Sequence, residues 1–189
     1  MTYHEYWNDI HGLQAELHQF LVSYWNDYSN AGTWQFWTIL FLLVLPLIIL
    51  YFAVDRSRIF ELFFFGFVVH MLWTYSDAAL SRMNFLTHTY FLSPYFYFTF
   101  SVTASLLPAG FLLLYQHCTN HHKNFYLYTI GLSFIFAFIF LTLEQYLGLV
   151  DMHNGMRKLY VFFIDIAIAY AAYWFTKFVL KLRKNRSPE

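Results

Sequence analysis

The sequence predicts an all-α fold, a polytopic membrane helix bundle with five transmembrane helices and an N-terminal amphipathic surface helix. Two observations support this prediction. Hydrophobic residues make up 59% of the 189-residue chain and charged residues only 12%, which is about half the charge of an ordinary soluble domain. Five apolar runs also approach or exceed about 20 residues, the length of helix that crosses the hydrocarbon core of a bilayer.

The five apolar runs define the expected transmembrane domain, residues 34–180. They cover residues 34–54, 59–79, 95–115, 125–147 and 159–180. The first run carries no charge and opens on tryptophans, which favour the membrane interface. Pro46 in the first run, and Pro108 with Gly110 in the third, predict bends, because a proline removes a helical hydrogen bond.

Residues 1–33 form a separate N-terminal segment. They lack the basic start and the continuous apolar core of a signal peptide. Apolar side chains instead recur at the helical period, and acidic side chains lie on the opposite face. The apolar face carries Tyr3, Trp7, Ile10, Leu17 and Leu21, and the acidic face carries Glu5, Asp9 and Glu16. We therefore expect an amphipathic helix that lies on the membrane surface.

The distribution of lysine and arginine predicts the orientation. If the N-terminus lies outside, five spans place eight basic residues on the inner side and three on the outer side. Basic residues favour the cytoplasmic side of a membrane. We therefore expect a multi-pass protein of the cell membrane, with the N-terminus outside and residues 181–189 as a basic cytoplasmic tail.

Ionisable residues within the apolar runs form a candidate intramembrane polar network. Its members are Glu144, Asp165, Asp77 and His70. Glu144 and Asp165 lie at similar depths on either side of a short turn, so antiparallel helices would bring them together. Two carboxylates held close cannot both ionise cheaply, so one should take up a proton, or Arg157 should neutralise one. Such a network either ties helices together or forms a proton, ion or substrate site.

Glu61 is expected to play a different, structural role. It lies nearly opposite His70 and Asp77 on the same expected helix, near the end of that helix expected on the inner side of the membrane. Arg56 or Arg58 is close enough in the sequence to pair with it, so we expect an ion pair there.

The inner loop "QHCTNHHKN" contains the possible metal ligands His117, Cys118, His121 and His122. Spacings of four residues could aim two of them together on a helical extension, but zinc needs three or four ligands. Nothing else in the sequence fixes this cluster, so we expect no metal and no cofactor. Zinc-protease, nucleophile-elbow and nucleotide-binding motifs are absent from the sequence. The net charge of zero and the lack of basic clusters argue against nucleic-acid binding.

Glycine and asparagine mark the connection between the last two runs. Gly148 follows Glu144 by four residues on the same helical face and should let the last helix approach closely. Asn154 and Gly155 should form a tight turn, because both tolerate positive φ.

Short motifs in the third run and after the fourth resemble a known family. They are "LPAGFLLLY" at residues 107–115 and "LEQYLGL" followed by "HNG" within residues 143–155. The segment from Asp55 to Leu180 resembles a family of small, uncharacterised polytopic membrane proteins from spore-forming Gram-positive bacteria. The family pattern falls here on Glu144, Gly148, Asn154, Gly155, Pro108 and Tyr115, while Met156 stands where the family often has an aromatic residue. The resemblance implies no known activity.

Three functions follow from these features. The first expectation is a non-enzymatic membrane protein that works by helix packing, with a second copy or a membrane-protein partner in the bilayer. The alternative is a small proton-coupled transporter or ion pathway that uses the intramembrane carboxylates. An intramembrane enzyme is the third reading. Transporters often contain two related halves, and the sequence has no convincing internal repeat, which favours the first expectation.

Overall fold

The structure, a computed structural model, describes residues 1–95 and 101–184 and consists of helices, turns and a small two-stranded sheet. The α-helices are α1 (Tyr3–Tyr24), α2 (Trp34–Ala53), α3 (Ile59–Arg82), α4 (Leu107–Asn120), α5 (Phe125–Phe134), α6 (Leu141–Tyr146) and α7 (Lys158–Lys184). The π-helical segments are η1 (Trp25–Ser29), η3 (Val102–Leu106) and η4 (Ile135–Phe140), and η2 (Arg56–Arg58) is a 3-10 turn. The strands are β1 (Leu86–His88) and β2 (Val150–Met152).

Within residues 1–95 and 101–184, four helices are long and apolar enough to cross a membrane. They cover Trp34–Ala53, Arg56–Arg82, Phe125–Tyr146 and Lys158–Arg183. These bounds agree with four of the predicted runs to within three residues at each end. The third predicted run, residues 95–115, lies partly outside the described residues. Its described part, in η3 and α4, continues beyond the prediction to Asn120.

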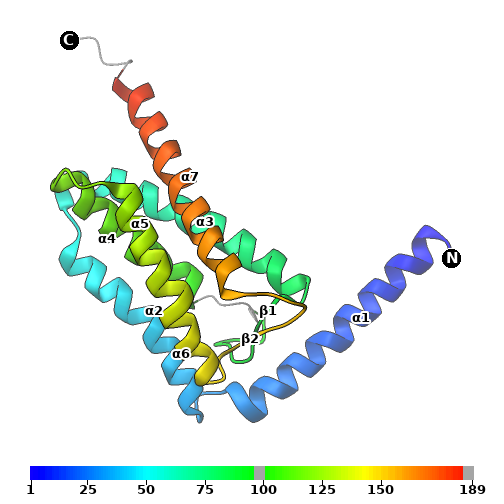
Figure 1. Cartoon of the computed structure of the whole chain (residues 1–189). Helices are drawn as coiled ribbons and strands as arrows, with labels where there is room; N and C mark the ends of the chain where they lie inside the picture. Colours follow the sequence, from blue (N-terminus) through cyan, green and yellow to red (C-terminus); the bar gives the residue numbers. More distant parts are fainter. Residues whose placement is uncertain (96–100, 185–189) are drawn as a thin grey trace.

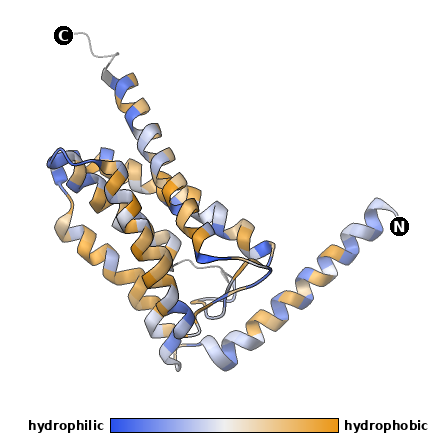
Figure 2. Ribbon diagram, in the orientation of Figure 1, coloured by the Kyte–Doolittle hydropathy of each residue, from blue (hydrophilic) through white to orange (hydrophobic). Residues whose placement is uncertain are grey.

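The described part of the third run packs among the other apolar helices. α4 contacts α2, α3 and α5, and α7 contacts α3 and α5 (Figure 1). Stacked aromatic rings join these helices: Phe65 lies on Tyr115 and Phe125 on Tyr173, each pair with ring centroids 4.5 Å apart. The bundle is mainly apolar, and its most hydrophilic residues gather at helix ends and turns (Figure 2). This distribution suits a lipid surrounding.

Close helix contacts occur at Gly66 and Gly110. A Cβ atom at Gly66 would lie 2.9 Å from Leu112 Cδ1, and one at Gly110 would lie 2.8 Å from Phe136 Cζ. The prediction that Gly148 lets the last helix approach closely is wrong, because a Cβ atom there would meet no described atom within 4 Å. Gly148 has φ +68° and lies just past the end of α6, so it is needed for the left-handed backbone conformation.

A short antiparallel sheet closes the end of the bundle near Gly148. Leu86 pairs with Met152 and His88 with Val150. These strands were not predicted from the sequence. They join the connection after α3 to the connection before α7, which lie far apart in the sequence (Figure 1).

The Asn154-Gly155 turn is confirmed. Asn154 has φ +52° and Gly155 has φ +78°. The turn closes with a 2.9 Å hydrogen bond from the Met156 N–H to the His153 carbonyl. It lets the chain turn sharply from β2 towards α7.

The N-terminal helix α1 projects away from the bundle (Figure 1). Its first turn is capped by Thr2 and Glu5, which form a reciprocal capping box. In the part of the chain that the structure describes, none of its residues is buried. At Ser29, the last residue of η1, the side-chain hydroxyl donates to the Phe91 carbonyl and accepts from the Phe91 N–H, each at 2.9 Å. A helix therefore forms in residues 1–33, and its place on a membrane surface stays a prediction.

Candidate functional site

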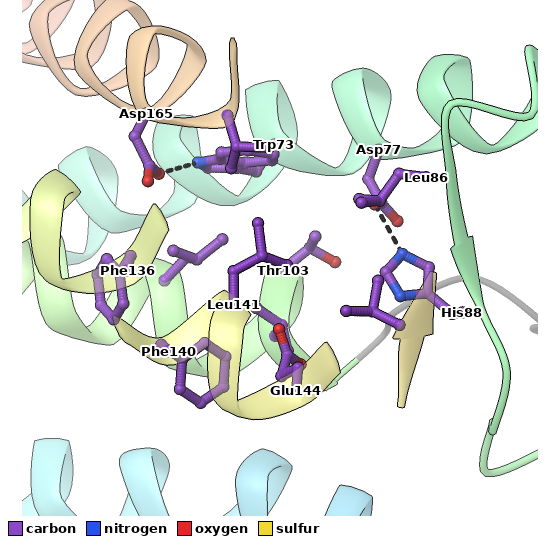
Figure 3. Close-up of a pocket in the computed structure, with 14 residues that line it drawn as sticks. Trp73, Asp77, Leu86, His88, Thr103, Phe136, Phe140, Leu141, Glu144 and Asp165 are labelled. Atoms are coloured by element: carbon purple, nitrogen blue, oxygen red, sulfur yellow. Dashed lines mark hydrogen bonds and ion pairs between the residues drawn. The ribbon is translucent and has the colours of Figure 1, made fainter. Parts of the chain in front are cut away.

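A cavity of about 50 Å³ lies between α3, η3, η4, α6, α7 and the small sheet. Among the described residues, its polar lining comes from Trp73, Asp77, His88, Thr103, Glu144 and Asp165. Leucine, valine and phenylalanine side chains form the rest of the wall. Figure 3 shows the acidic side chains on different elements around the same space. The structure thus gathers three of the four predicted network residues around one cavity.

Asp77 and His88 form a buried pair on one side of this cavity. The Asp77 carboxyl lies on α3, and the His88 ring comes from β1. His88 Nε2 lies 2.9 Å from Asp77 Oδ1 and donates a hydrogen bond to it (Figure 3). Asp77 Oδ2 has no hydrogen-bond partner within the described parts of the chain. The pair holds the sheet against α3 and leaves one carboxylate oxygen open.

The charge of His88 depends on its acidic neighbours. Burial lowers the pKa of His88, but the charge of Asp77, the hydrogen bond to Asp77 and the charge of Glu144 together raise that pKa above its ordinary value. His88 was not predicted from the sequence, because it lies outside the apolar runs. The available signal was an isolated histidine in "NFLTHTY", directly after a span that carries an aspartate.

Asp165 is held by an indole. Trp73 Nε1 on α3 donates a 3.0 Å hydrogen bond to Asp165 Oδ1 on α7 (Figure 3). The Asp165 side chain is buried, and its Oδ2 atom has no hydrogen-bond partner among the residues that the structure describes. Trp73 precedes Asp77 by four residues and therefore shares a face of α3 with it, but its bond to Asp165 depends on how α3 and α7 are rotated.

Glu144 is positioned by the end of α6. The Leu149 N–H donates to the Glu144 carbonyl at 2.8 Å, and the Gly148 N–H donates to the Gln145 carbonyl at 3.0 Å. These two bonds form a Schellman motif, which the left-handed conformation of Gly148 makes possible. The backbone thereby leaves the helix at Gly148, one turn after Glu144, and the Glu144 carboxyl group lies against the cavity.

Glu144 and Asp165 occupy different parts of the cavity wall (Figure 3). In residues 1–95 and 101–184, no hydrogen bond directly joins their carboxyl groups. Asp165 accepts from Trp73, whereas Glu144 lies close enough to His88 for its charge to act there. A proton shared between Glu144 and Asp165 therefore stays a prediction.

His70 was predicted in the network, but it is not among the described residues that line the cavity. The reason lies in η3. The Leu107 N–H donates to the Val102 carbonyl, five residues back, and the next donor in this register would be Pro108, which has no N–H. The Thr103 carbonyl that this donor would serve lies 2.9 Å from His70 Nδ1, which donates to it. His70 therefore supports the backbone beside a proline.

Glu61 forms the ion pair predicted for it. Arg58 Nη2 lies 2.6 Å from Glu61 Oε1, and Arg58 Nε lies 3.2 Å from Glu61 Oε2. The Tyr115 hydroxyl also donates to Glu61. Arg58 Nη1 donates in addition to Thr119 and Asn120. These bonds satisfy both charges and tie α3 to α4.

The His117–His122 loop shows no metal-binding arrangement. The rings of His117 and His121 are 4.8 Å apart, and Cys118 is buried. Throughout the described ranges, no three histidine, cysteine, aspartate or glutamate side chains converge as metal ligands. The described acids of the cavity are included in this finding, so they too form no group of three metal ligands.

The chain matches no protein-family model, no curated protein and no solved structure. The resemblance to the small polytopic family of spore-forming bacteria stays a prediction.

Proposed function

We propose that the chain is a five-span, non-enzymatic protein of the cell membrane that acts as a small proton-coupled transporter. Asp77, His88, Glu144 and Asp165 bind and release the protons. The proposal places these groups in the outer half of the membrane, with the N-terminus outside and the C-terminus in the cytoplasm.

Packing and charge support the proposed number of spans and their orientation. The helix formed by η3 and α4 contacts α2, α3 and α5. This packing favours η3 and α4 as part of a fifth span among the other apolar helices. An odd number of spans puts the termini on opposite sides. The basic residues then divide eight inside to three outside.

The observation that carries the proposed function is the pair of open carboxylate oxygens. Asp77 Oδ2 and Asp165 Oδ2 are buried without a hydrogen-bond partner among described residues, and both side chains line the cavity. An unpartnered charge in an apolar environment is costly, and intramembrane acids therefore mark proton or substrate paths. Taking up a proton neutralises the carboxylate, so the cavity is suited to bind protons.

The size of the cavity is compatible with proton exchange. A volume of 50 Å³ holds about three to five water-sized molecules. Water bridging the acids would let protons pass between groups that do not touch.

Infrared spectroscopy of the reconstituted protein tests the proposal. The carbonyl stretch of protonated carboxyl groups is followed as the pH is varied between about 5 and 9. The wild type should show a titrating band from buried carboxyl groups. The double variant Glu144→Gln/Asp165→Asn should fold, because the amides preserve shape, but it should lose most of this band.

Asp151→Asn is the matched control, because Asp151 is an exposed acid on β2. The control should keep the buried-carboxyl band. If the wild type shows no band that Glu144→Gln/Asp165→Asn removes, the cavity does not exchange protons and the proposed function is wrong.

A second candidate function is helix packing alone. The Trp73–Asp165 bond joins α3 to α7, and the Asp77–His88 pair joins the sheet to α3, so both can serve as structural ties. In that case the Glu144→Gln/Asp165→Asn variant should keep the association state of the wild type in mild detergent. It should also keep any partner that copurifies.

A further inference from the structure

The cavity has an excess of acidic groups. Among the described residues that line it, three carboxyl groups face a single imidazole. Even with His88 protonated, full ionisation would leave an excess of negative charge. A low-dielectric site of this kind attracts a positively charged occupant.

Two acids present open hydrogen-bond acceptors at the cavity wall. Asp77 and Asp165 are only 2% and 1% exposed, and each uses one oxygen on a neighbouring side chain. The other oxygen of each has no partner in residues 1–95 and 101–184. Both side chains line the cavity, so their open oxygens are available to an N–H donor inside it (Figure 3).

The arrangement does not suit a metal ion. Hard cations require several oxygen ligands converging at short distance. No such group of three side chains exists within the described ranges. Instead, the acids stand apart, with Leu141 and other apolar side chains between them (Figure 3).

The apolar wall favours an organic cation. Trp73, Phe136 and Phe140 bring aromatic rings to the cavity. Aromatic faces attract ammonium groups, and the remaining wall can bury a short alkyl chain. The volume of 50 Å³ limits the occupant to about three to five heavy atoms.

We infer that the cavity binds a small primary alkylammonium ion, whose N–H groups donate to the open oxygen of Asp165, beside the Trp73 indole. This inference rests on the proposed proton-coupled function and names its substrate class. Binding is balanced as an exchange: one alkylammonium enters as the ion and one carboxyl group releases its proton. Charge inside the cavity is then unchanged.

Proton release on ligand addition tests the inference. Propylammonium chloride is added to the full chain in detergent micelles, in weakly buffered solution with a pH-indicating dye. Wild-type protein should release about one proton per bound propylammonium. Propan-1-ol, which has the same number of heavy atoms but no charge, and potassium chloride should release none.

Variants locate the binding site. Asp165→Asn should weaken propylammonium binding by roughly tenfold or more, since it removes a charged acceptor. Asp151→Asn should bind as the wild type does. Size-exclusion chromatography shows whether each variant is folded. If Asp165→Asn does not fold, the comparison of the three additives on the wild type still decides the ligand class.

The outcomes separate this inference from the proposed function. If the infrared band titrates but propylammonium releases no proton, the substrate class is wrong and the proton site stands. Equal proton release by potassium chloride would also overturn the organic-cation class. If the infrared band itself does not titrate, the proposed function fails first.

Discussion

At the scale of single residues, the two aspartates of the cavity share one pattern. Each has one oxygen bound to a ring nitrogen, Asp77 to His88 and Asp165 to Trp73. The bound oxygen fixes the rotation of the carboxyl group. The second oxygen of each has no hydrogen-bond partner among the described residues, and both side chains line the cavity. A side chain that is oriented but not saturated is ready to accept a proton or a ligand.

The first prediction concerns the pH dependence of the Asp77–His88 pair. A group whose folded-state pKa is raised contributes stability that is complete below its unfolded pKa and is lost as the pH rises through the folded pKa. His88 is such a group, with Asp77 on α3 and Glu144 on α6 as its acidic neighbours. His88→Gln should therefore lower the free energy of unfolding by about 1–3 kcal/mol near pH 6, and by less near pH 9.

Unfolding in detergent at the two pH values measures this difference. His153→Gln, at an exposed position of the connection between β2 and α7, is the control and should show little change at either pH. An equal penalty for His88→Gln at both pH values would show that the pair stabilises the fold without a charged imidazole.

The acids of the site could be predicted from sequence, but their partners could not. Acidic residues inside apolar runs stand out because the membrane makes them costly. Which group hydrogen-bonds to each acid depends on the rotation of the helices and on the path of the connecting segments. Trp73 meets Asp165 only through the packing of α3 on α7, and His88 arrives on a strand of three residues. The role of Gly148 was likewise not predictable from its spacing, because it serves backbone conformation and not helix contact.

At the scale of elements, long periodic segments were predictable and short ones were not. Four apolar helices follow their predicted runs closely, because about 20 apolar residues leave a membrane chain few alternatives to a helix. The strands β1 and β2 are too short for an alternating pattern to appear. Their pairing depends on contacts between residues far apart in the sequence, such as His88 and Val150, which are 62 residues apart.

The second prediction concerns the contact between α4 and η4. Gly110→Ala would place a Cβ atom 2.8 Å from Phe136 Cζ, and that ring already packs against Phe111 with centroids 5.6 Å apart. The ring would have to move, and because Phe136 lines the cavity, the cavity would change shape. We expect destabilisation of about 1–3 kcal/mol, measured by thermal or denaturant unfolding in detergent.

Gly131→Ala is the matched control for Gly110→Ala. It is the same change inside a helix of the same bundle, but a Cβ atom at Gly131 would meet no described atom within 4 Å. Alanine should leave stability unchanged or raise it by up to about 1 kcal/mol, because it lowers the entropy lost on folding. Equal losses in both variants would show that the Gly110 contact is not specific.

At the scale of the whole molecule, polarity is inverted relative to a soluble domain. Large apolar side chains such as Phe52 and Phe60 are exposed on the helices, while charged groups are buried at the cavity. A lipid surrounding makes this arrangement favourable. The helix α1 shows the same exposure of apolar groups. Its Tyr3, Leu13 and Phe20 side chains are exposed and need an apolar environment of their own.

The last prediction concerns the orientation of the chain in the membrane. The five proposed spans would place the termini on opposite sides, and the division of eight basic residues against three predicts that the C-terminal side lies in the cytoplasm. A reporter that is active only in the cytoplasm should therefore give signal when fused after Glu189. The same reporter inserted after Gly155, in the turn before α7, should be silent, because that turn lies at the opposite end of the last span. Signal from the Gly155 insertion and silence from a stably expressed Glu189 fusion would reverse the orientation. The cavity acids would then open towards the cytoplasm, and the direction of proton coupling would be reversed with them.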